Sequence, residues 1–233
     1  MRRIKSSRDL REKPQVVAAV HSLGALRRAE RIQAGEVDLL EIRVDNFAPD
    51  PTPVLKVLPR LRVPLIVTVR HPAEGGAHRL SLKERRDLFA QFLPWATFID
   101  VELRSWEQLA STVDAARRSG VKIIASAHHF HAMPPAARLL STIRRAGAAG
   151  ADISKIAALA ETPGALARLL SLLEKKQPLP VSVMGMGRFG KISRLLLAQA
   201  GSALNYGYLD RPNASGQWEA TVLKKRLAEL EEA

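Results

Sequence analysis

Lys155 stands inside a short apolar run that would suit a buried strand. The residues around it, Ile153–Ala157, are mostly apolar, so a strand there would hold the amine away from water. Desolvation and a nearby cation such as Arg43 or Arg194 disfavour the ammonium form and lower the pKa of a lysine. A neutral amine attacks carbonyl groups and forms Schiff bases. The sequence therefore predicts Lys155 as a nucleophile; the alternative is a lysine at a strand end that binds phosphate or carboxylate.

Other ionisable side chains fall in or directly after strand-like runs. Glu41 and Arg43 are two residues apart, as are Asp100 and Glu102, so each pair shares one face of an extended chain. Burial of a charge is unfavourable unless the charge is paired or bound. A charged ligand explains the whole set, whereas a buried ion-pair role fits Asp100 with Glu102 equally well. The set is Glu41, Arg43, Arg70, Asp100, Glu102, His128, Lys155 and Arg194.

His128 is the candidate for proton transfer. The segment Ser126–His131 contains three histidines, which raises the question of a metal site. His128 and His129 would point to opposite sides of an extended chain, and zinc sites gather their ligands from separate elements. We therefore predict no metal site, and instead a single imidazole at a strand end that acts as general acid and base.

The elements that must position these residues follow a regular alternation. Eight short runs rich in β-branched residues are separated by stretches with helical periodicity. The predicted strands are Val16–Val20, Leu39–Val44, Leu65–Val69, Thr97–Glu102, Lys122–Ala127, Asp152–Ile156, Pro180–Met184 and Ser202–Tyr206. The predicted helices include Ser81–Phe92, Trp106–Ser119, Pro134–Ala148, Pro163–Lys175, Ile192–Ala200 and Ala220–Glu232. Ser81 with Glu84 is a capping-box signature, and Gly120 and Gly201 stand where left-handed helix ends belong.

This alternation predicts an α/β fold, a single (β/α)8 TIM barrel over residues 14–233 with a basic segment at residues 1–13 before it. An open doubly wound sheet would carry a glycine-rich phosphate loop after an early strand. The only GxGxxG match, Gly185–Gly190, follows the seventh predicted strand. Active sites of parallel barrels lie at the carboxyl ends of the strands, where the ionisable residues fall.

Composition and charge restrict the class of protein. The 233 residues include no cysteine, which excludes disulfides and thiolate metal sites. The net charge is +13, but the basic residues are scattered and only 5% of residues are aromatic, so we predict no nucleic-acid partner. No apolar run reaches the roughly 18 residues of a membrane helix, and the N-terminal segment does not read as a signal peptide. We expect no membrane association and a cytoplasmic location.

Several different short motifs follow one another between residues 16 and 217. They are Glu41-Ile42-Arg43-Val44-Asp45, Thr68-Val69-Arg70 with Glu74-Gly75-Gly76, Ser126-Ala127-His128, Ala151–Ala157, Met186-Gly187, Gly190–Arg194 and Gly216-Gln217. The set resembles the type I 3-dehydroquinate dehydratases, the Schiff-base-forming enzymes of the shikimate pathway in aromatic amino acid biosynthesis. The resemblance implies a homodimeric hydro-lyase that needs no cofactor and converts 3-dehydroquinate to 3-dehydroshikimate.

The resemblance also implies a role for each site residue. Lys155 condenses with the C3 ketone, His128 removes a C2 proton and returns a proton to the departing C1 hydroxyl, and Glu74 orients His128. Substrate binding falls to a second group: Arg194 with Gln217 holds the carboxylate, Glu41, Arg43 and Arg70 surround the ring hydroxyls, and Asn213 lies in the lid segment.

Three residues depart from the family pattern. Ala19 stands where a serine is usual, His129 where Asp or Asn usually follows the catalytic histidine, and Asn213 where the lid usually carries a serine. Asn213 keeps hydrogen-bonding capacity, so we expect altered binding with the reaction type retained. His129 is expected to affect the protonation of His128.

Two other functions remain open on the residues alone. A class I aldolase or transaldolase also uses a barrel lysine, and would need a phosphate site, for which Gly185–Gly190 could supply backbone N–H groups. A non-catalytic basic binding protein on the same barrel would bind nucleic acid or an acidic protein in a strongly salt-dependent way.

Overall fold

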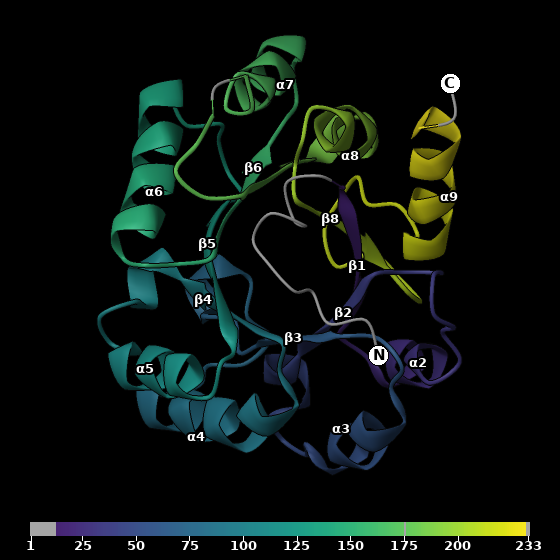
Figure 1. The fold of residues 1–233 in the computed structure, drawn as a ribbon, viewed down its shortest axis with the longest axis vertical. Helices are drawn as coiled ribbons and strands as arrows, with labels where there is room; N and C mark the ends of the chain where they lie inside the picture. Colours follow the sequence, from purple (N-terminus) through teal and green to yellow (C-terminus); the bar gives the residue numbers. More distant parts are fainter. Residues whose placement is uncertain (1–12, 175, 232–233) are drawn as a thin grey trace.

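The computed structural model describes residues 13–174 and 176–231. In this part of the chain eight parallel strands form one sheet, in the order β7-β6-β5-β4-β3-β2-β1-β8, and the sheet curls into a barrel (Figure 1). The strands are β1 Gln15–Val20, β2 Leu39–Arg43, β3 Leu65–Thr68, β4 Phe98–Glu102, β5 Lys122–His129, β6 Ile153–Leu159, β7 Val181–Met186 and β8 Leu204–Tyr208. The predicted (β/α)8 barrel is confirmed.

Some predicted segments fall outside this description. Of the predicted basic segment at residues 1–13, only Lys13 belongs to the described residues. The predicted helix ends at Lys175 and Glu232 lie outside them as well.

Serine side chains close the barrel between β7 and β8, where no regular ladder forms. Ser202 Oγ accepts the Val183 N–H at 2.9 Å and donates to Val183 O at 3.1 Å. Ser182 Oγ donates to Leu204 O at 2.6 Å. These hydroxyls satisfy backbone groups that would otherwise be buried without partners, and the barrel is nearly closed as a result.

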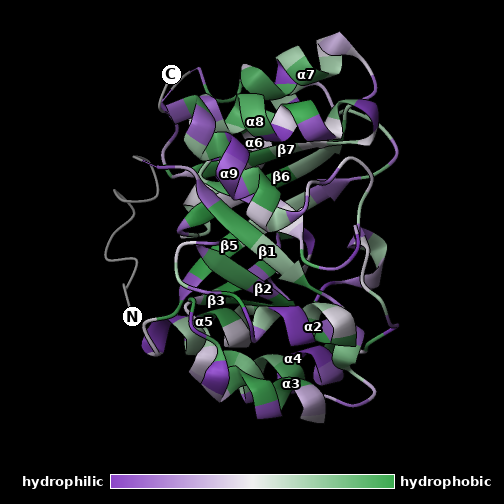
Figure 2. Cartoon of the chain, turned by 90° about the vertical axis from the view of Figure 1, so that its right-hand side faces the viewer, coloured by the Kyte–Doolittle hydropathy of each residue, from purple (hydrophilic) through white to green (hydrophobic). Residues whose placement is uncertain are grey.

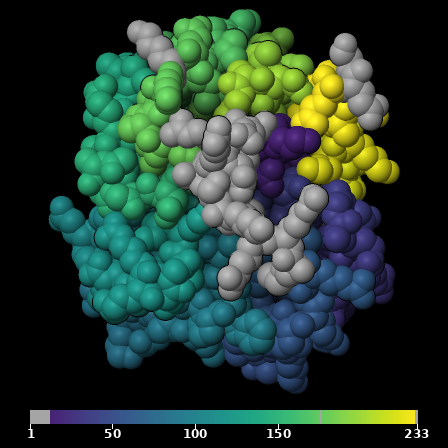
Figure 3. Space-filling view, in the orientation of Figure 1, coloured from purple at the N-terminus to yellow at the C-terminus, as the bar shows by residue number. Residues whose placement is uncertain are grey.

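Helices follow the strands and cover the barrel. They are α2 Leu23–Ala29, α3 Thr52–Val57, α4 Leu82–Phe92, α5 Ala110–Arg118, α6 Ala136–Ala148, α7 Pro163–Leu170, α8 Gly190–Gln199 and α9 Ala220–Glu231. The sequence colours run in order around the molecule (Figure 3), and α9 packs beside β1. The last helix therefore covers the seam between the first and last strands.

Local sequence signals placed several helix ends correctly. Ser81 caps α4 in a reciprocal capping box with Glu84, and Gly120 and Gly201 have φ of 70° and 98°. The helix predicted from Trp106 instead begins at Ala110, because the chain first forms a 3₁₀ turn at Leu103–Ser105.

The inward faces of the strands change character along the barrel axis. One face of β2 carries Leu39, Glu41 and Arg43. Leu39 belongs to an apolar cluster inside the barrel that also contains Phe98 and Ile153. In β2, β4 and β6 a charged residue follows the cluster residue by two positions, towards the carboxyl end of the strand: Glu41, Asp100 and Lys155. The strands themselves are mostly hydrophobic (Figure 2). An apolar floor thus fills one end of the barrel and a polar site lies above it.

Candidate active site

All the residues that the family resemblance assigns to catalysis or substrate binding line one cavity of about 110 Å³ at the carboxyl ends of the strands. The predicted residues in its wall are Glu41, Arg43, Arg70, Glu74, His128, Lys155, Arg194, Asn213 and Gln217. The wall also contains residues for which no role was predicted: Gly75, Phe130, Ala157, Met184, Met186, Tyr206 and Ala214. Tyr206 could have been found, since it ended the eighth predicted strand.

Lys155 projects from β6 into the barrel and is 3% exposed. Its Nζ lies 2.9 Å from Asp100 Oδ2, 3.3 Å from Glu41 Oε1 and 3.8 Å from the centre of the Tyr206 ring. The predicted neighbour of this amine was a cation, Arg43 or Arg194. The charged groups bonded to it are carboxylates instead, because Glu41 and Asp100 occupy the same level of the barrel on β2 and β4.

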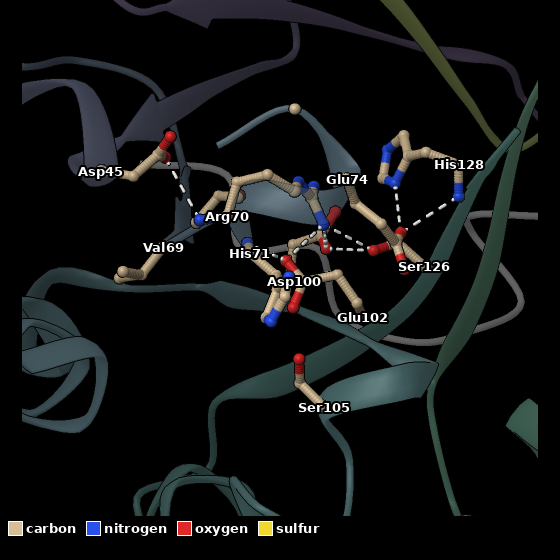
Figure 4. Close-up of polar contacts among 12 residues, drawn as sticks. Asp45, Val69, Arg70, His71, Glu74, Asp100, Glu102, Ser105, Ser126 and His128 are labelled. Atoms are coloured by element: carbon tan, nitrogen blue, oxygen red, sulfur yellow. Dashed lines mark hydrogen bonds and ion pairs between the residues drawn. The ribbon is translucent and has the colours of Figure 1, made fainter. Parts of the chain in front are cut away.

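Arg70 connects the carboxylates below the cavity (Figure 4). Its Nη1 lies 2.9 Å from Asp100 Oδ1 and 3.0 Å from Glu102 Oε1, and donates to Ser126 Oγ at 2.7 Å. Burial raises the pKa of Asp100, but Arg70 and Lys155 outweigh burial and hold that pKa well below its usual range. Both members of the pair Asp100 and Glu102 are therefore ion-paired, and Asp100 also contacts the candidate nucleophile.

Glu74 and His128 form a hydrogen-bonded pair at the cavity wall (Figure 4). Glu74 Oε2 lies 2.9 Å from His128 Nδ1 and accepts the His128 backbone N–H at 3.1 Å. Because this oxygen already accepts one N–H, we assign the ring proton to Nδ1. His128 Nε2 then carries the lone pair that a general base needs.

Burial sets the proton affinities of this pair. Burial, with the cations Arg70 and Lys155, holds the pKa of His128 well below its usual value. Burial also raises the pKa of Glu74 to about 7, although Arg70 opposes that rise. Near neutral pH the imidazole is consequently uncharged and able to accept a proton.

Arg194 is held by backbone carbonyls. Its Nε donates to Tyr206 O at 2.7 Å, and its Nη1 donates to the carbonyls of Gly185, Gly190 and Gly216 at 2.8 to 2.9 Å. Burial lowers the pKa of Arg194 to about 10. No carboxylate among the described residues lies within 4.0 Å of it. Its charge at the cavity is thus available to an anionic ligand.

Arg43 and the loop at residues 209–219 form the rim of the cavity. Arg43 makes a two-point contact with Asp45, at 2.9 and 2.8 Å, and donates to Gly75 O at 2.8 Å. Gln217 Oε1 accepts the Asn213 N–H at 3.0 Å, so the two predicted binding residues of the loop are linked to each other.

The residues that depart from the family pattern occupy different places. Ala19 is buried and lies outside the cavity wall, whereas Asn213 is in it. His129 is half-buried, and its Nε2 has no hydrogen-bond partner among the described residues. Burial and Arg138 lower the pKa of His129. Within residues 13–174 and 176–231, no cluster of three or more His, Asp or Glu side chains could hold a metal ion.

The glycine-rich segment Gly185–Gly190 has its backbone donors occupied. The Gly187 N–H donates to Ser215 Oγ at 3.0 Å, the Arg188 N–H to Glu161 Oε1 at 3.2 Å, and the Phe189 N–H to Ala160 O at 3.0 Å. A carboxylate already lies where a phosphate would bind, which disfavours the aldolase-type phosphate site.

Among the described residues, each helix is too short or too polar to span a lipid bilayer.

Comparison with known proteins identifies the family. The sequence model of the type I 3-dehydroquinases matches residues 16–233. The 3-dehydroquinate dehydratase of Methanocella arvoryzae is 36% identical over 207 residues, which is 88% of this chain and 91% of the relative. The crystal structure of the 3-dehydroquinate dehydratase from Geobacillus kaustophilus matches with a TM-score of 0.85 at 29% identity, covering 95% of this chain and 92% of that one. The type I enzyme from Clostridium difficile matches with a TM-score of 0.84 at 28% identity, covering 94% and 93%. This chain belongs to the type I 3-dehydroquinase family.

Proposed function

We propose that this chain dehydrates 3-dehydroquinate to 3-dehydroshikimate through a Schiff base on Lys155. The observation that carries the proposal is the content of one cavity: a buried amine, an imidazole hydrogen-bonded to a carboxylate, and an arginine that pairs with no carboxylate among the described residues. The names of the relatives support the choice of substrate.

Imine formation begins at Lys155. After losing a proton, Nζ attacks the C3 carbonyl carbon to give a carbinolamine, which loses water to give a protonated imine. Glu41 Oε1, 3.3 Å from Nζ, is placed to accept the proton. The structure of the Clostridium difficile enzyme was solved with covalently modified comenic acid, which fits covalent chemistry in this family.

His128 performs the proton transfers. The protonated imine withdraws electrons from C2 and makes the C2 proton acidic, so that His128 Nε2 can remove it. The same imidazole then gives a proton to the C1 hydroxyl, which leaves as water as the C1–C2 double bond forms. Water hydrolyses the imine, releases the product and restores the amine.

The remaining residues bind and orient the substrate. Arg194 binds the substrate carboxylate, assisted by Gln217, because a buried guanidinium favours an anionic partner. Glu41, Arg43 and Arg70 contact the ring hydroxyls, and Asn213 contributes from the loop at residues 209–219. Glu74 keeps the imidazole in the tautomer that its role requires.

Trapping tests the covalent step directly. The protein is incubated with 3-dehydroquinate and borohydride, and the adduct is mapped by mass spectrometry. We expect a reduced adduct on Lys155 in the parent and in the exposed-lysine control Lys83→Met, and none in Lys155→Met, which should also form no conjugated enone by ultraviolet absorbance. Turnover by Lys155→Met at the parent rate would refute the mechanism.

We further propose that the protein works as a homodimer in the cytoplasm. The family resemblance supports the dimer, and the lack of cysteine is compatible with a reducing compartment. Light scattering of the purified full chain tests the dimer: a monomer mass at micromolar concentration would contradict it.

A further inference from the structure

We propose that Phe130, packed on Gly75, is a positioning residue that covers the Glu74–His128 pair and keeps water from it. The effect of Phe130 on catalysis rests on the proposed function, in which His128 transfers the protons. Its geometric basis is independent of the reaction.

Phe130 lies over the imidazole. The two ring centres are 6.0 Å apart and the ring planes differ by 12°, within the range of stacked aromatic pairs. Phe130 follows His128 by two residues, directly after β5 ends at His129, and both side chains line the cavity. Phe130 is 36% exposed and the His128 side chain 10%, so the stacked Phe130 ring lies on the solvent side of the imidazole.

Gly75 makes room for the Phe130 ring beside Glu74. It has φ of 84°, a conformation that residues with a Cβ rarely adopt. A Cβ built there would lie 3.1 Å from Phe130 Cζ, closer than ordinary van der Waals contact. The ring therefore packs against the backbone that directly follows Glu74, and touches the segments that carry both members of the pair.

The other strands contribute Ala157, Met184, Met186 and Tyr206 to the apolar part of the cavity wall. The groups that act electrostatically on the pair are charged and do not exclude water. Those acting on His128 are Arg70, Lys155, Asp100 and Arg43, and those acting on Glu74 are Arg70, Glu102 and Asp100. Burial is nevertheless the largest cause of the low pKa of His128 and of the rise of the Glu74 pKa to about 7. At the mouth of the cavity the Phe130 ring provides the apolar cover, so that Glu74 takes up a proton before the imidazole does.

The test is the site of protonation in the full-length protein. Histidines labelled with ¹³C at Cε1 are titrated by NMR, and the His128 signal is identified by its loss in His128→Asn. We expect His128 of the parent to protonate well below pH 6.5. Phe130→Ala should raise the midpoint by about one pH unit or more, towards the ordinary value. Phe130→Leu should give a smaller rise, and Trp95→Ala, which removes an exposed aromatic side chain outside the cavity, should give none.

An unchanged His128 midpoint in Phe130→Ala overturns the inference. If that variant fails to fold, Phe130→Leu decides in the same way. The NMR readout needs neither substrate nor imine, so it stands even if no adduct forms on Lys155, a result that would refute the proposed function alone.

A double-mutant cycle separates cover of the pair from contact with substrate. Phe130→Ala should lower kcat both in the parent and in a Glu74→Gln background. We expect the fold-decrease to be at least about threefold smaller in the Glu74→Gln background, because the Glu74–His128 pair is already impaired there. Equal factors in both backgrounds would show that Phe130 acts on the substrate alone, and would contradict the inference.

Discussion

Lys155, Arg70 and Arg194 are all buried cations, yet they are compensated differently. Lys155 and Arg70 share Asp100, and Arg70 also pairs with Glu102. Within the described part of the chain, Arg194 forms hydrogen bonds only with carbonyl oxygens. Burial of an uncompensated charge is unfavourable, so this residue gains most from an anionic ligand. The difference explains why we assign the substrate carboxylate to Arg194 rather than to the more numerous charges near Lys155.

Glu74 is expected to lower the stability of the folded protein at high pH while it supports catalysis. Its pKa in the folded protein is raised to about 7, so the folded state binds its proton more tightly than the unfolded state does. The associated stability is fully present below the unfolded-state pKa and is lost as pH rises through 7. We expect Glu74→Gln to increase the free energy of unfolding at pH 8 by on the order of 1–3 kcal/mol, with no increase at pH 4.

Chemical denaturation at the two pH values measures this effect, and the exposed Glu107→Gln serves as the matched control. The same Glu74→Gln variant should lose activity by up to about 100-fold, the lower end of what general acid–base catalysis contributes. A Glu74→Gln protein with parental stability at pH 8 would show that the carboxylate is better accommodated than its surroundings indicate.

The Tyr206 hydroxyl is expected to be dispensable. It is buried and has no hydrogen-bond partner among the described residues, while the ring lies 3.8 Å from Lys155 Nζ. Removing an unsatisfied buried hydroxyl is neutral or stabilising by about 1 kcal/mol, and phenylalanine keeps the ring. Tyr206→Phe should retain kcat within about twofold and match or exceed the parental unfolding free energy. A tenfold loss of kcat would instead assign the hydroxyl to the chemistry.

At the level of elements, the sequence predicted the barrel because strand and helix signals alternate without interruption. The strand ends were harder to predict. β5 and β6 extend to His129 and Leu159, beyond the predicted ends at Ala127 and Ile156, because pairing between the two strands continues to Ala158. The length of a strand thus depends on how far its neighbour pairs with it, and a local sequence pattern does not contain that information.

The sequence predicted which residues form the site better than it predicted which of them contact one another. Period-two spacing placed Glu41 and Asp100 on inward faces, but their contact with Lys155 depends on which strands meet across the barrel. For the same reason Tyr206 was not selected, since β8 comes close to the amine on β6 only when the barrel closes between β7 and β8. Sequence spacing predicts which face of a strand a side chain occupies. The closure of the sheet determines which other side chains that face contacts.

The loop at residues 209–219, between β8 and α9, is tied down at both ends. Ser22 Oγ donates to Asp210 Oδ2 at 2.5 Å while it accepts the Ala25 N–H as the cap of α2. At the other end, the Gly187 N–H donates to Ser215 Oγ. The loop that carries Asn213 and Gln217 is thereby attached to the segments after β1 and β7.

Loss of the Ser22 contact should weaken substrate binding. In Asp210→Ala the loop must be ordered during binding, so we expect KM to rise by about 2- to 10-fold, equivalent to one hydrogen bond, with a smaller change in kcat. Steady-state kinetics measure both constants, and Arg211→Ala controls for a change in the same loop. If KM is unchanged while deuterium exchange in the loop increases, the order of the loop is unimportant for binding.

The whole molecule carries a net charge of +13, which is far more than the site requires. The charge admits two explanations: a field that guides an anionic substrate, or a surface for an acidic macromolecule. The site geometry favours the former, because the cavity contains a cation without a carboxylate partner in the described part of the chain.

Ionic strength distinguishes the two explanations. Between about 0.01 M and 1 M salt the Debye length shrinks from roughly 30 Å to 3 Å, so long-range attraction of the substrate carboxylate is lost while contacts inside the buried site persist. We therefore expect kcat/KM to fall as sodium chloride increases, with kcat nearly constant, provided that substrate capture limits kcat/KM. Choline chloride should reproduce the fall, since ionic strength rather than the cation is responsible. A kcat/KM independent of salt, with nucleic-acid binding that weakens steeply over the same range, would assign the charge to a macromolecular partner instead.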